Sequence, residues 1–304
     1  MLALRKKYYK NVIISYLNVN SIRNKFNDIN TLLAKNVNVL CVAETKIDNS
    51  FSENQFLLEG FKKPYRLDIN ARSGGLLLYV SEDIPSRLLK KKSIPCDIQL
   101  IPIELNFRKQ KWLCICIYRP PLQNLNYFLE HLSNVISYYM IDYENVVIMG
   151  DFNATSFDLE NASFLSNYDL SSLIKSPTCY KSMKGSCIDL ILTNKKNSFQ
   201  KFNTFETGIS DHHLLIYSMF KLTYEKLPPK KQKYRSFKNF CPTKFENDLH
   251  KKLPFTARGN FSKLNCGIRL ALDENAPIKT RFLRGNNKPK IPKQLRKAMM
   301  KRSL

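Results

Sequence analysis

Residues 145–154 read Asn-Val-Val-Ile-Met-Gly-Asp-Phe-Asn-Ala, so an apolar run of strand length ends on a carboxylate and an amide. A short apolar run bounded by a turn residue is typical of a buried strand. Ligands of α/β proteins bind outside the ends of such strands. Asp151 and Asn153 are therefore candidate functional residues, although Gly150 and Asp151 also suit an ordinary turn.

Five more apolar segments stand beside polar side chains in the same way. They are residues 12–17 with Asn18 and Asn20, 37–43 with Glu44, 112–117 with Tyr118, Ile188 with Asp189, and Ser210-Asp211-His212-His213 before 214–220. Each alone has a structural explanation, such as a turn, a cap or a partly buried imidazole. Together they predict one crevice that collects side chains far apart in sequence.

Alternating strand and helix patterns over residues 1–220 predict an α/β domain. Apolar residues recur at helical spacing behind Ser21, which predicts an amphipathic helix over 21–34. Similar patterns predict a helix over 124–139 and strands over 74–80, 98–105, 112–117, 187–193 and 214–220. Consecutive strands with short connections pair antiparallel, so we expect a mixed sheet or two packed sheets.

Composition limits the class of protein. A chain of 304 residues with 43% hydrophobic residues can bury a sizeable core. Its apolar runs fall short of the roughly 20 residues of a membrane span, and residues 1–10 are basic without the apolar part of a signal peptide. We therefore expect an intracellular protein with no membrane segment. The eight cysteines lack zinc-type spacing, so we expect reduced core thiols, with a disulfide framework as the alternative.

The net charge of +24 is concentrated in the last part of the chain. Residues 221–304 hold 23 Lys/Arg against 5 Asp/Glu, which is +18, and residues 1–220 hold 26 against 20, which is +6. A polyanion such as nucleic acid is the expected partner, with affinity that falls with salt. The alternative is a solubilising or partly disordered extension.

Two stretches of the basic region have patterns of their own. Pro228-Pro229 and the lysines that follow mark a linker, and residues 294–300 show helical patterning. Residues 226–235 resemble a basic nuclear-import stretch, which predicts a nuclear location. Linker chemistry and phosphate contacts explain the same residues.

The polar residues at the strand ends suit phosphoester hydrolysis. Glu44, Asp151, Asp189 and Asp211 offer the oxygen ligands that Mg²⁺ prefers. Asn18, Asn153 and Tyr118 can donate hydrogen bonds to phosphate oxygens. A carboxylate or His212 can manage the proton of an attacking water. A mixed set of this kind is what cleavage of a charged ester requires.

In their order, these motifs resemble the endonuclease/exonuclease/phosphatase superfamily, and within it the apurinic-type endonuclease domain of non-LTR retrotransposons. The motifs are Leu-Asn-Val-Asn-Ser at 17–21, Ala-Glu-Thr-Lys at 43–46, Ser-Gly-Gly-Leu-Leu-Leu-Tyr-Val at 73–80, Tyr-Arg-Pro-Pro at 118–121, Gly-Asp-Phe-Asn-Ala at 150–154, Ile-Asp-Leu-Ile-Leu at 188–192 and Ser-Asp-His-His at 210–213. The resemblance covers about residues 11–220. Each motif alone is weak, whereas the ordered set is specific.

The resemblance implies three regions: a basic segment over 1–10, the nuclease domain over 11–222, and a basic connector over 223–304 that in such elements precedes a reverse transcriptase. No polymerase segment follows, so the chain resembles a truncated element protein or a host gene derived from one. The implied fold is a four-layer α/β/β/α sandwich of two sheets with outer helices. The implied activity is Mg²⁺-dependent nicking of DNA, with Mn²⁺ as a substitute, leaving a 3′ hydroxyl and a 5′ phosphate.

The resemblance also implies roles for single residues. Glu44 would hold the metal with Asn18 and Asp211. Asn153 and Tyr118 would fix the scissile phosphate, and Asp151 would orient or deprotonate the water or protonate the leaving group. His212 would stabilise the transition state, oriented by Asp189. Supporting contacts to substrate are expected from Asn20, Thr178 and Ser210.

Two other functions remain open from the sequence. The same fold could act on another phosphoester, such as a lipid or inositol phosphate, because fold does not fix substrate. A fragment without its polymerase could also bind nucleic acid without cutting it. The partners expected in either nucleic-acid case are DNA and, through the basic region, element RNA.

Overall fold

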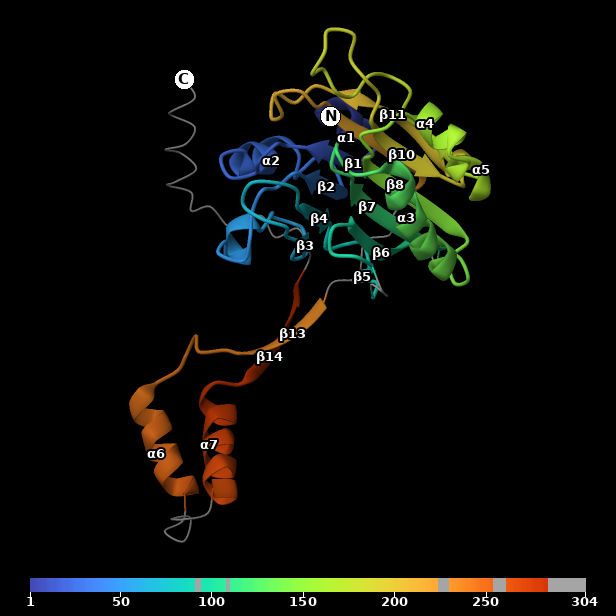
Figure 1. The fold of residues 1–304 in the computed structure, drawn as a ribbon. Helices are drawn as coiled ribbons and strands as arrows, with labels where there is room; N and C mark the ends of the chain where they lie inside the picture. Colours follow the sequence, from blue (N-terminus) through green and yellow to red (C-terminus); the bar gives the residue numbers. More distant parts are fainter. Residues whose placement is uncertain (91–93, 108–109, 224–229, 254–260, 284–304) are drawn as a thin grey trace, which may run out of the picture. The chain divides into compact units, whose positions relative to one another are not determined.

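The computed structural model describes residues 1–90, 94–107, 110–223, 230–253 and 261–283. The chain divides into two compact units, Met1–Lys226 and Leu227–Leu304 (Figure 1). The predicted helical stretch 294–300, the Pro228-Pro229 linker and the first part of the basic stretch 226–235 lie outside the described residues. Within those residues, no helix is both long enough and apolar enough to span a bilayer.

Two six-stranded sheets form the first unit. The first sheet has the order β11 (Phe199–Phe205), β12 (Leu215–Thr223), β1 (Asn11–Asn18), β2 (Val39–Ala43), β4 (Leu76–Val80) and β3 (Tyr65–Leu67). The second has the order β5 (Ser86–Leu88), β6 (Gln99–Phe107), β7 (Gln110–Tyr118), β8 (Asn145–Asp151), β10 (Asp189–Thr193) and β9 (Ser171–Ser172). Both sheets are mixed, because β1–β2 and β7–β8 are parallel while β6–β7 and the remaining pairs are antiparallel.

Alternation along the strands builds four layers from these sheets. Tyr16 of β1 and Cys116 of β7 lie in the core between the sheets. Their strand neighbours Leu17 and Ile115 face the opposite way, into separate outer cores. Helices cover those outer faces (Figure 1): α2 (Phe26–Leu32) with the 3₁₀ helix η1 (Glu53–Phe56) on one side, and α3 (Leu125–Tyr139), α4 (Ser156–Asn161) and α5 (Phe164–Asn167) on the other. The predicted four-layer sandwich is confirmed.

The helix predicted over 21–34 is shorter than expected, because α2 begins only at Phe26. Ser21 is not its N-cap: its backbone φ is +91°, and its N–H donates to the carbonyl of Glu44 at 2.7 Å. The next N–H, of Ile22, donates to Thr45. These backbone bonds tie the segment to the loop after β2 and delay the helix. The second predicted helix is confirmed, with Asn124 capping it by accepting from the Tyr127 N–H.

Short elements complete the first unit: α1 (Leu2–Lys7) and the 3₁₀ helix η2 (Lys196–Ser198). All eight cysteines are free thiols. Cys41, Cys114 and Cys116 are buried between the sheets as expected, whereas three others, Cys96, Cys241 and Cys266, are exposed. The expectation of core thiols therefore holds only for part of the set.

The second unit consists of a two-stranded antiparallel ribbon and two helices, and along the chain the helices come between the two strands. Its elements in order are β13 (Lys230–Arg235), α6 (Pro242–Lys252), α7 (Phe261–Asn275) and β14 (Ile278–Leu283). Gly267 allows α7 to approach the end of α6, because a Cβ there would stand 2.7 Å from the Leu253 side chain. Asn275 joins the helices by donating to Asp248 at 3.0 Å.

Gly150 is required where β8 runs beside β7. A Cβ at this position would stand 2.2 Å from the carbonyl oxygen of Ile117, which is backbone and cannot move aside alone. We expect Gly150→Ala to lower the free energy of unfolding by about 1–3 kcal/mol, the usual cost of overpacking. Urea unfolding measures this. Leu122→Ala, at a fully exposed side chain, is the control, and equal midpoints for the two variants would contradict the prediction.

Candidate active site

One amide joins the two sheets at their strand ends. Asn18, the last residue of β1, is 1% exposed, and its Nδ2 donates to Glu44 Oε1 at 2.8 Å and to Asp151 Oδ2 at 3.1 Å. Glu44 follows β2 in the first sheet, and Asp151 ends β8 in the second. The structure therefore brings together three of the predicted site residues from segments far apart in sequence.

The backbone at Glu44 is strained. Glu44 and Lys46 have φ values of +51° and +52°, in the left-handed region that residues of this kind seldom adopt. Such strain persists where surrounding contacts enforce it, and it clusters at functional sites. Here the Lys46 N–H donates to Gly74 at 3.0 Å. The loop thus presents the Glu44 carboxylate to Asn18 and to the Lys46 ammonium, which stands 3.4 Å from Glu44 Oε2.

Glu44 is held ionised by its neighbours. Burial opposes the charged form, but hydrogen bonds from Asn18 and Tyr118 and the charge of Lys46 outweigh it, and they lower the pKa of Glu44. Tyr118 shows the reverse effect: burial and the charges of Glu44 and Asp151 raise its pKa well above the ordinary value. Tyr118 therefore keeps its proton and can donate a hydrogen bond.

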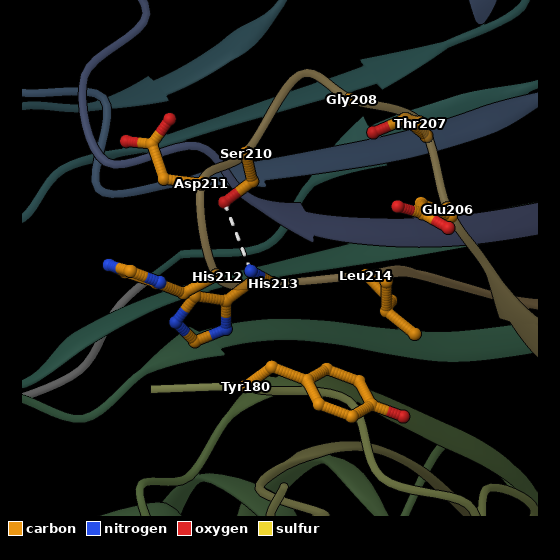
Figure 2. A pocket seen from close by; sticks show the side chains of 9 residues that line it. All are labelled: Tyr180, Glu206, Thr207, Gly208, Ser210, Asp211, His212, His213 and Leu214. Atoms are coloured by element: carbon orange, nitrogen blue, oxygen red, sulfur yellow. Dashed lines mark hydrogen bonds between the residues drawn. The ribbon is translucent and has the colours of Figure 1, made fainter. Parts of the chain in front are cut away.

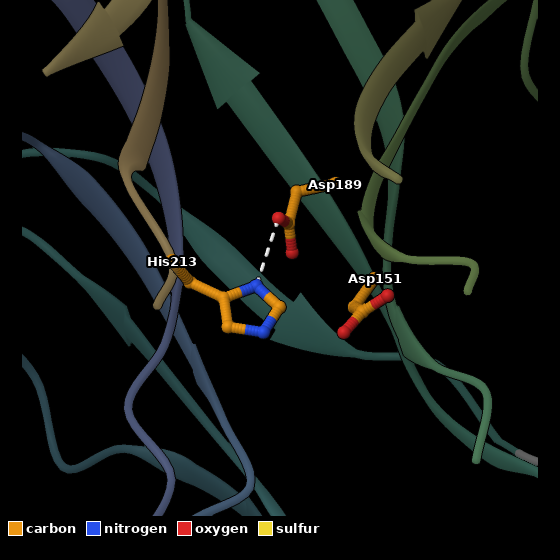
Figure 3. Close-up of side chains that lie close together, drawn as sticks. All are labelled: Asp151, Asp189 and His213. Carbon is orange, nitrogen blue, oxygen red and sulfur yellow. Dashed lines mark hydrogen bonds and ion pairs between the residues drawn. The ribbon is translucent and has the colours of Figure 1, made fainter. Parts of the chain in front are cut away.

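Asp189 is paired with a buried histidine. Its Oδ2 accepts a hydrogen bond from His213 Nδ1 at 3.0 Å, and the two residues are 0% and 4% exposed (Figure 3). Thr178 fixes the Asp189 backbone, because its hydroxyl accepts the Asp189 N–H at 3.0 Å. The other ring nitrogen of His213 contacts Cys179 Sγ at 3.5 Å.

The predicted pairing of Asp189 with His212 is wrong, because the next residue takes that place. The backbone of His213 pairs with that of Cys179 in an isolated antiparallel β-bridge, and the backbone N–H of His213 donates to the Ser210 hydroxyl at 3.3 Å. Neighbouring side chains on extended backbone point to opposite sides. His213 therefore points inward, and His212 is exposed.

The side-chain carboxyl of Asp151 has a pKa close to neutral pH. Burial and the negative charge of Asp189 raise its pKa to about 7, against the opposing charge of His213 and the hydrogen bond from the Asn153 N–H at 2.8 Å. For His213, burial favours the neutral ring, but the bond and charge of Asp189 prevail and raise its pKa. Groups perturbed in this way are suited to proton transfer.

These acidic and imidazole groups could also hold a metal ion. Asp151, Asp189 and His213 are all buried, and one ligand atom from each lies within 4.8 Å of the others (Figure 3). Asp189 Oδ1 is buried with no hydrogen-bond partner in the described chain, so it is an oxygen available to a cation. The donor set fits a divalent metal.

A buried arginine that sequence reasoning did not single out organises the loop around Asn153. Arg119 is 5% exposed, and its guanidinium donates to the carbonyls of Phe152 at 2.5 Å, Asn153 at 2.7 Å and Gln123. In return, Asn153 Nδ2 donates to the Arg119 carbonyl at 2.7 Å. This exchange holds Asn153 at a φ of +45° beside Asp151. In the sequence, Arg119 is marked only by its place in the Tyr-Arg-Pro-Pro motif.

The remaining predicted residues lie at the edge of this cluster. Asp211 is outside the buried Asp–Asp–His group, with a side chain 62% exposed and paired with Lys25 at 3.5 Å. A metal role for Asp211 stays a prediction that this placement does not support. Asn20 is exposed, and its N–H donates to Asn18 Oδ1 at 3.1 Å while its side chain accepts from Lys46.

A pocket of about 330 Å³ opens beside His213 (Figure 2). The loop around Ser210 forms one wall, with His212 and Glu206 among its residues, and Tyr180 lies across from it (Figure 2). A Tyr180 N–H to His212 carbonyl bond of 2.8 Å joins the two sides. The pocket gives a ligand access next to the buried histidine.

The pKa of His213 provides a test of the Asp189 pair. Asp189→Asn removes the charge that favours the imidazolium, so we expect the His213 pKa to fall in metal-free protein, as measured by NMR titration. Because folding raises this pKa, the protonated ring stabilises the folded protein at pH values below the unfolded-state pKa of about 6.5. This contribution is lost as the pH rises through the folded-state pKa. Asp211→Asn, at an exposed carboxylate, is the control. A His213 pKa that Asp189→Asn leaves unchanged would refute the pairing.

Comparison with known proteins agrees with this architecture. A family model described as endonuclease-reverse transcriptase matches residues 112–216. No curated protein matches the chain significantly. Among solved structures, the endonuclease domain of TRAS1, a telomere-specific non-LTR retrotransposon, aligns with a TM-score of 0.55 at 13% identity, over 69% of this chain and 99% of that one.

Two enzymes of other kinds share the fold. The 3′ phosphatase NExo from Neisseria, solved with a product DNA hairpin, aligns with a TM-score of 0.55 at 16% identity, over 69% of this chain and all of that one. An AP endonuclease from Archaeoglobus fulgidus aligns with a TM-score of 0.50 at 18% identity and the same coverage. The family match over residues 112–216 and the paired six-stranded sheets shared with the TRAS1 domain confirm the predicted resemblance to the endonuclease/exonuclease/phosphatase superfamily and, within it, to the endonucleases of non-LTR retrotransposons.

Proposed function

We propose that the chain is a Mg²⁺-dependent endonuclease that nicks DNA and leaves a 3′ hydroxyl and a 5′ phosphate. The observation that carries the proposal is the Asn18 amide, which joins a carboxylate from each sheet at one point. A perturbed carboxyl and an Asp–His pair stand beside it. These are the groups that hydrolysis of a charged ester needs. The product DNA in the Neisseria structure supports DNA as the substrate class.

Glu44, with Asn18, would hold the metal at this point. Glu44 offers ionised oxygen ligands of the kind Mg²⁺ prefers, with Mn²⁺ as the expected substitute. The buried oxygen of Asp189 that lacks a partner is a further donor. A bound ion would stabilise the charge that develops on the phosphate and on the leaving oxygen.

The other residues would act on protons and on the phosphate. Asp151, with a pKa of about 7, would accept the proton of the attacking water or return one to the leaving oxygen. His213, whose protonated form is favoured by Asp189 through a raised pKa, would stabilise the phosphate charge by donating a hydrogen bond. Tyr118 would donate a second bond, and Arg119 would hold Asn153 in position.

Conversion of supercoiled plasmid to open circles tests this function. We expect nicking in Mg²⁺ and in Mn²⁺, none in EDTA, and nicked ends that a polymerase extends without prior treatment. Nicking that persists in EDTA, or ends that carry a 3′ phosphate, would contradict the proposal. Salt-sensitive plasmid binding without nicking in either metal would instead indicate a silent binding module. Release of phosphate from inositol phosphates, with no nicking, would indicate a different phosphoester.

We also propose that the protein enters the nucleus, because a DNA-cutting enzyme must reach chromosomal DNA. The basic stretch 226–235 resembles an import signal and would supply this function. A fluorescent reporter fused to residues 221–240 should then accumulate in nuclei. A reporter that stays in the cytoplasm would remove the proposal.

A further inference from the structure

The β13–β14 ribbon of the second unit is strongly cationic. Its strands read Lys-Lys-Gln-Lys-Tyr-Arg and Ile-Lys-Thr-Arg-Phe-Leu, so six of its residues carry positive charge and none carries negative charge. The strands pair antiparallel along their whole length, with Lys230 opposite Leu283 and Arg235 opposite Ile278. This register places each cation opposite an uncharged residue, so the positive charges follow one another along the two strands, and their summed field attracts a polyanion.

One face of the ribbon carries an ordered arginine. Residues directly opposite each other share a face, so Arg281, Lys279, Gln232 and Tyr234 lie on the same side. The Arg281 guanidinium stands over the Tyr234 ring, 5.2 Å from its centroid, and its Nε donates to Gln232 Oε1 at 2.9 Å. Stacking and this bond limit its rotamers before any ligand binds, and a guanidinium so fixed can donate two bonds to a phosphate.

The ribbon is anchored at one end and exposes three further cations. Arg235 pairs with Asp273 of α7 at 2.7 Å and donates to the Ala276 carbonyl at 3.1 Å. Among the residues that the structure describes, no ion pair joins an acidic side chain to Lys233, Lys279 or Arg281. Lys233, Lys279 and Arg281 are all exposed. Their charge is therefore available to a partner.

We propose that the β13–β14 ribbon is a second DNA-binding element, which contacts the phosphates of duplex DNA independently of the nuclease site. Charge complementarity gives the partner its chemistry. The shape of the element favours duplex DNA over duplex RNA. A two-stranded ribbon fits the major groove of B-form DNA, about 12 Å wide, whereas the major groove of A-form RNA is deep and too narrow for side chains to read.

The test is equilibrium binding of the full chain to a short fluorescent DNA duplex in EDTA, over a series of salt concentrations. EDTA separates binding from cutting, so the result does not depend on the proposed endonuclease activity. The test variant is Lys233→Ala/Lys279→Ala/Arg281→Ala. The matched control is Lys238→Ala/Lys244→Ala/Lys251→Ala, which removes the same charge from exposed positions of the same unit.

We expect the ribbon variant to lower the slope of log K against log salt by about 0.9 for each phosphate that it no longer neutralises. The control should keep a slope close to that of the parent, and a duplex RNA of equal length should bind more weakly than the DNA. Equal weakening of binding in the two variants would overturn the proposal, because only net charge would then matter. RNA bound as tightly as DNA, with the same weakening in the ribbon variant, would overturn it too. Circular dichroism confirms that each variant is folded.

Discussion

Asp151→Asn is expected to slow DNA nicking by about 10²–10⁴-fold, the usual contribution of a positioned acid or base. The amide keeps the size of the carboxyl and can still accept from the Asn153 N–H, which donates to Asp151 Oδ1 at 2.8 Å, but its NH₂ group then faces Asn18 Nδ2 and the 3.1 Å bond from Asn18 is lost. It cannot take up or release a proton near neutral pH, whereas Asp151 has a pKa of about 7. The loss of proton transfer should therefore appear in the rate, whereas the lost Asn18 bond should cost only about 0.5–1.5 kcal/mol of stability.

A measurement of stability distinguishes a loss of catalysis in Asp151→Asn from a loss of folded protein. The folded-state pKa of Asp151 is raised, so above that pKa the protein must hold an ionised carboxylate against burial and against Asp189. Removing that charge is not expected to lower the free energy of unfolding at pH 8. Single-turnover nicking rates and urea unfolding are the two measurements, with the exposed Asp142→Asn as control. A nicking rate equal to that of the parent would exclude Asp151 from the chemistry.

His213→Ala is expected to reduce nicking by about 10²–10³-fold, the cost of losing one donor to a transition-state oxyanion. His212→Ala should leave the rate close to that of the parent. The difference follows from burial and pairing, because His213 is 4% exposed and bonded to Asp189, while the His212 side chain is exposed. The same single-turnover assay measures both variants.

Two further variants show whether the slow rate of His213→Ala comes from lost catalysis or from a folding defect. His213→Gln keeps a polar side chain of similar reach and should fold while remaining slow. Asp189→Asn should lower the rate less than His213→Ala, because the imidazole remains but loses the charge that favours its protonated form. If His212→Ala were the slow variant and His213→Ala the fast one, the sequence-based assignment would be right and the pairing seen here would not matter for catalysis.

The strand ends of the site could be predicted from sequence because their signals are local. The run before Gly150 shows the length and turn residue of a buried strand, and the run before Asn18 is likewise mainly apolar and of strand length. Strand alternation and the parallel pairs β1–β2 and β7–β8 then bring Asn18, Glu44 and Asp151 together. A small set of local patterns therefore fixes much of the four-layer fold and half of the site.

What sequence reasoning missed depends on contacts between distant segments. His212 and His213 are adjacent and chemically identical. Which ring points inward depends on the backbone β-bridge between His213 and Cys179, a contact between distant segments. Arg119 is satisfied by backbone carbonyls of other loops, and a pattern of side chains carries no record of such bonds. The ribbon of the second unit pairs strands separated by two helices, and its low apolar content hides it from periodicity.

The central claim is that the point where Asn18 joins Glu44 and Asp151 is a metal-dependent nicking centre. The most direct test is the initial rate of plasmid nicking in Mg²⁺ by the full chain and by Glu44→Gln, with DNA binding by both proteins measured in EDTA. We predict equal binding and a nicking rate for Glu44→Gln near the level of the EDTA control, because the amide loses the ionised oxygens that would hold the metal. Undiminished Mg²⁺-dependent nicking by Glu44→Gln would contradict the claim.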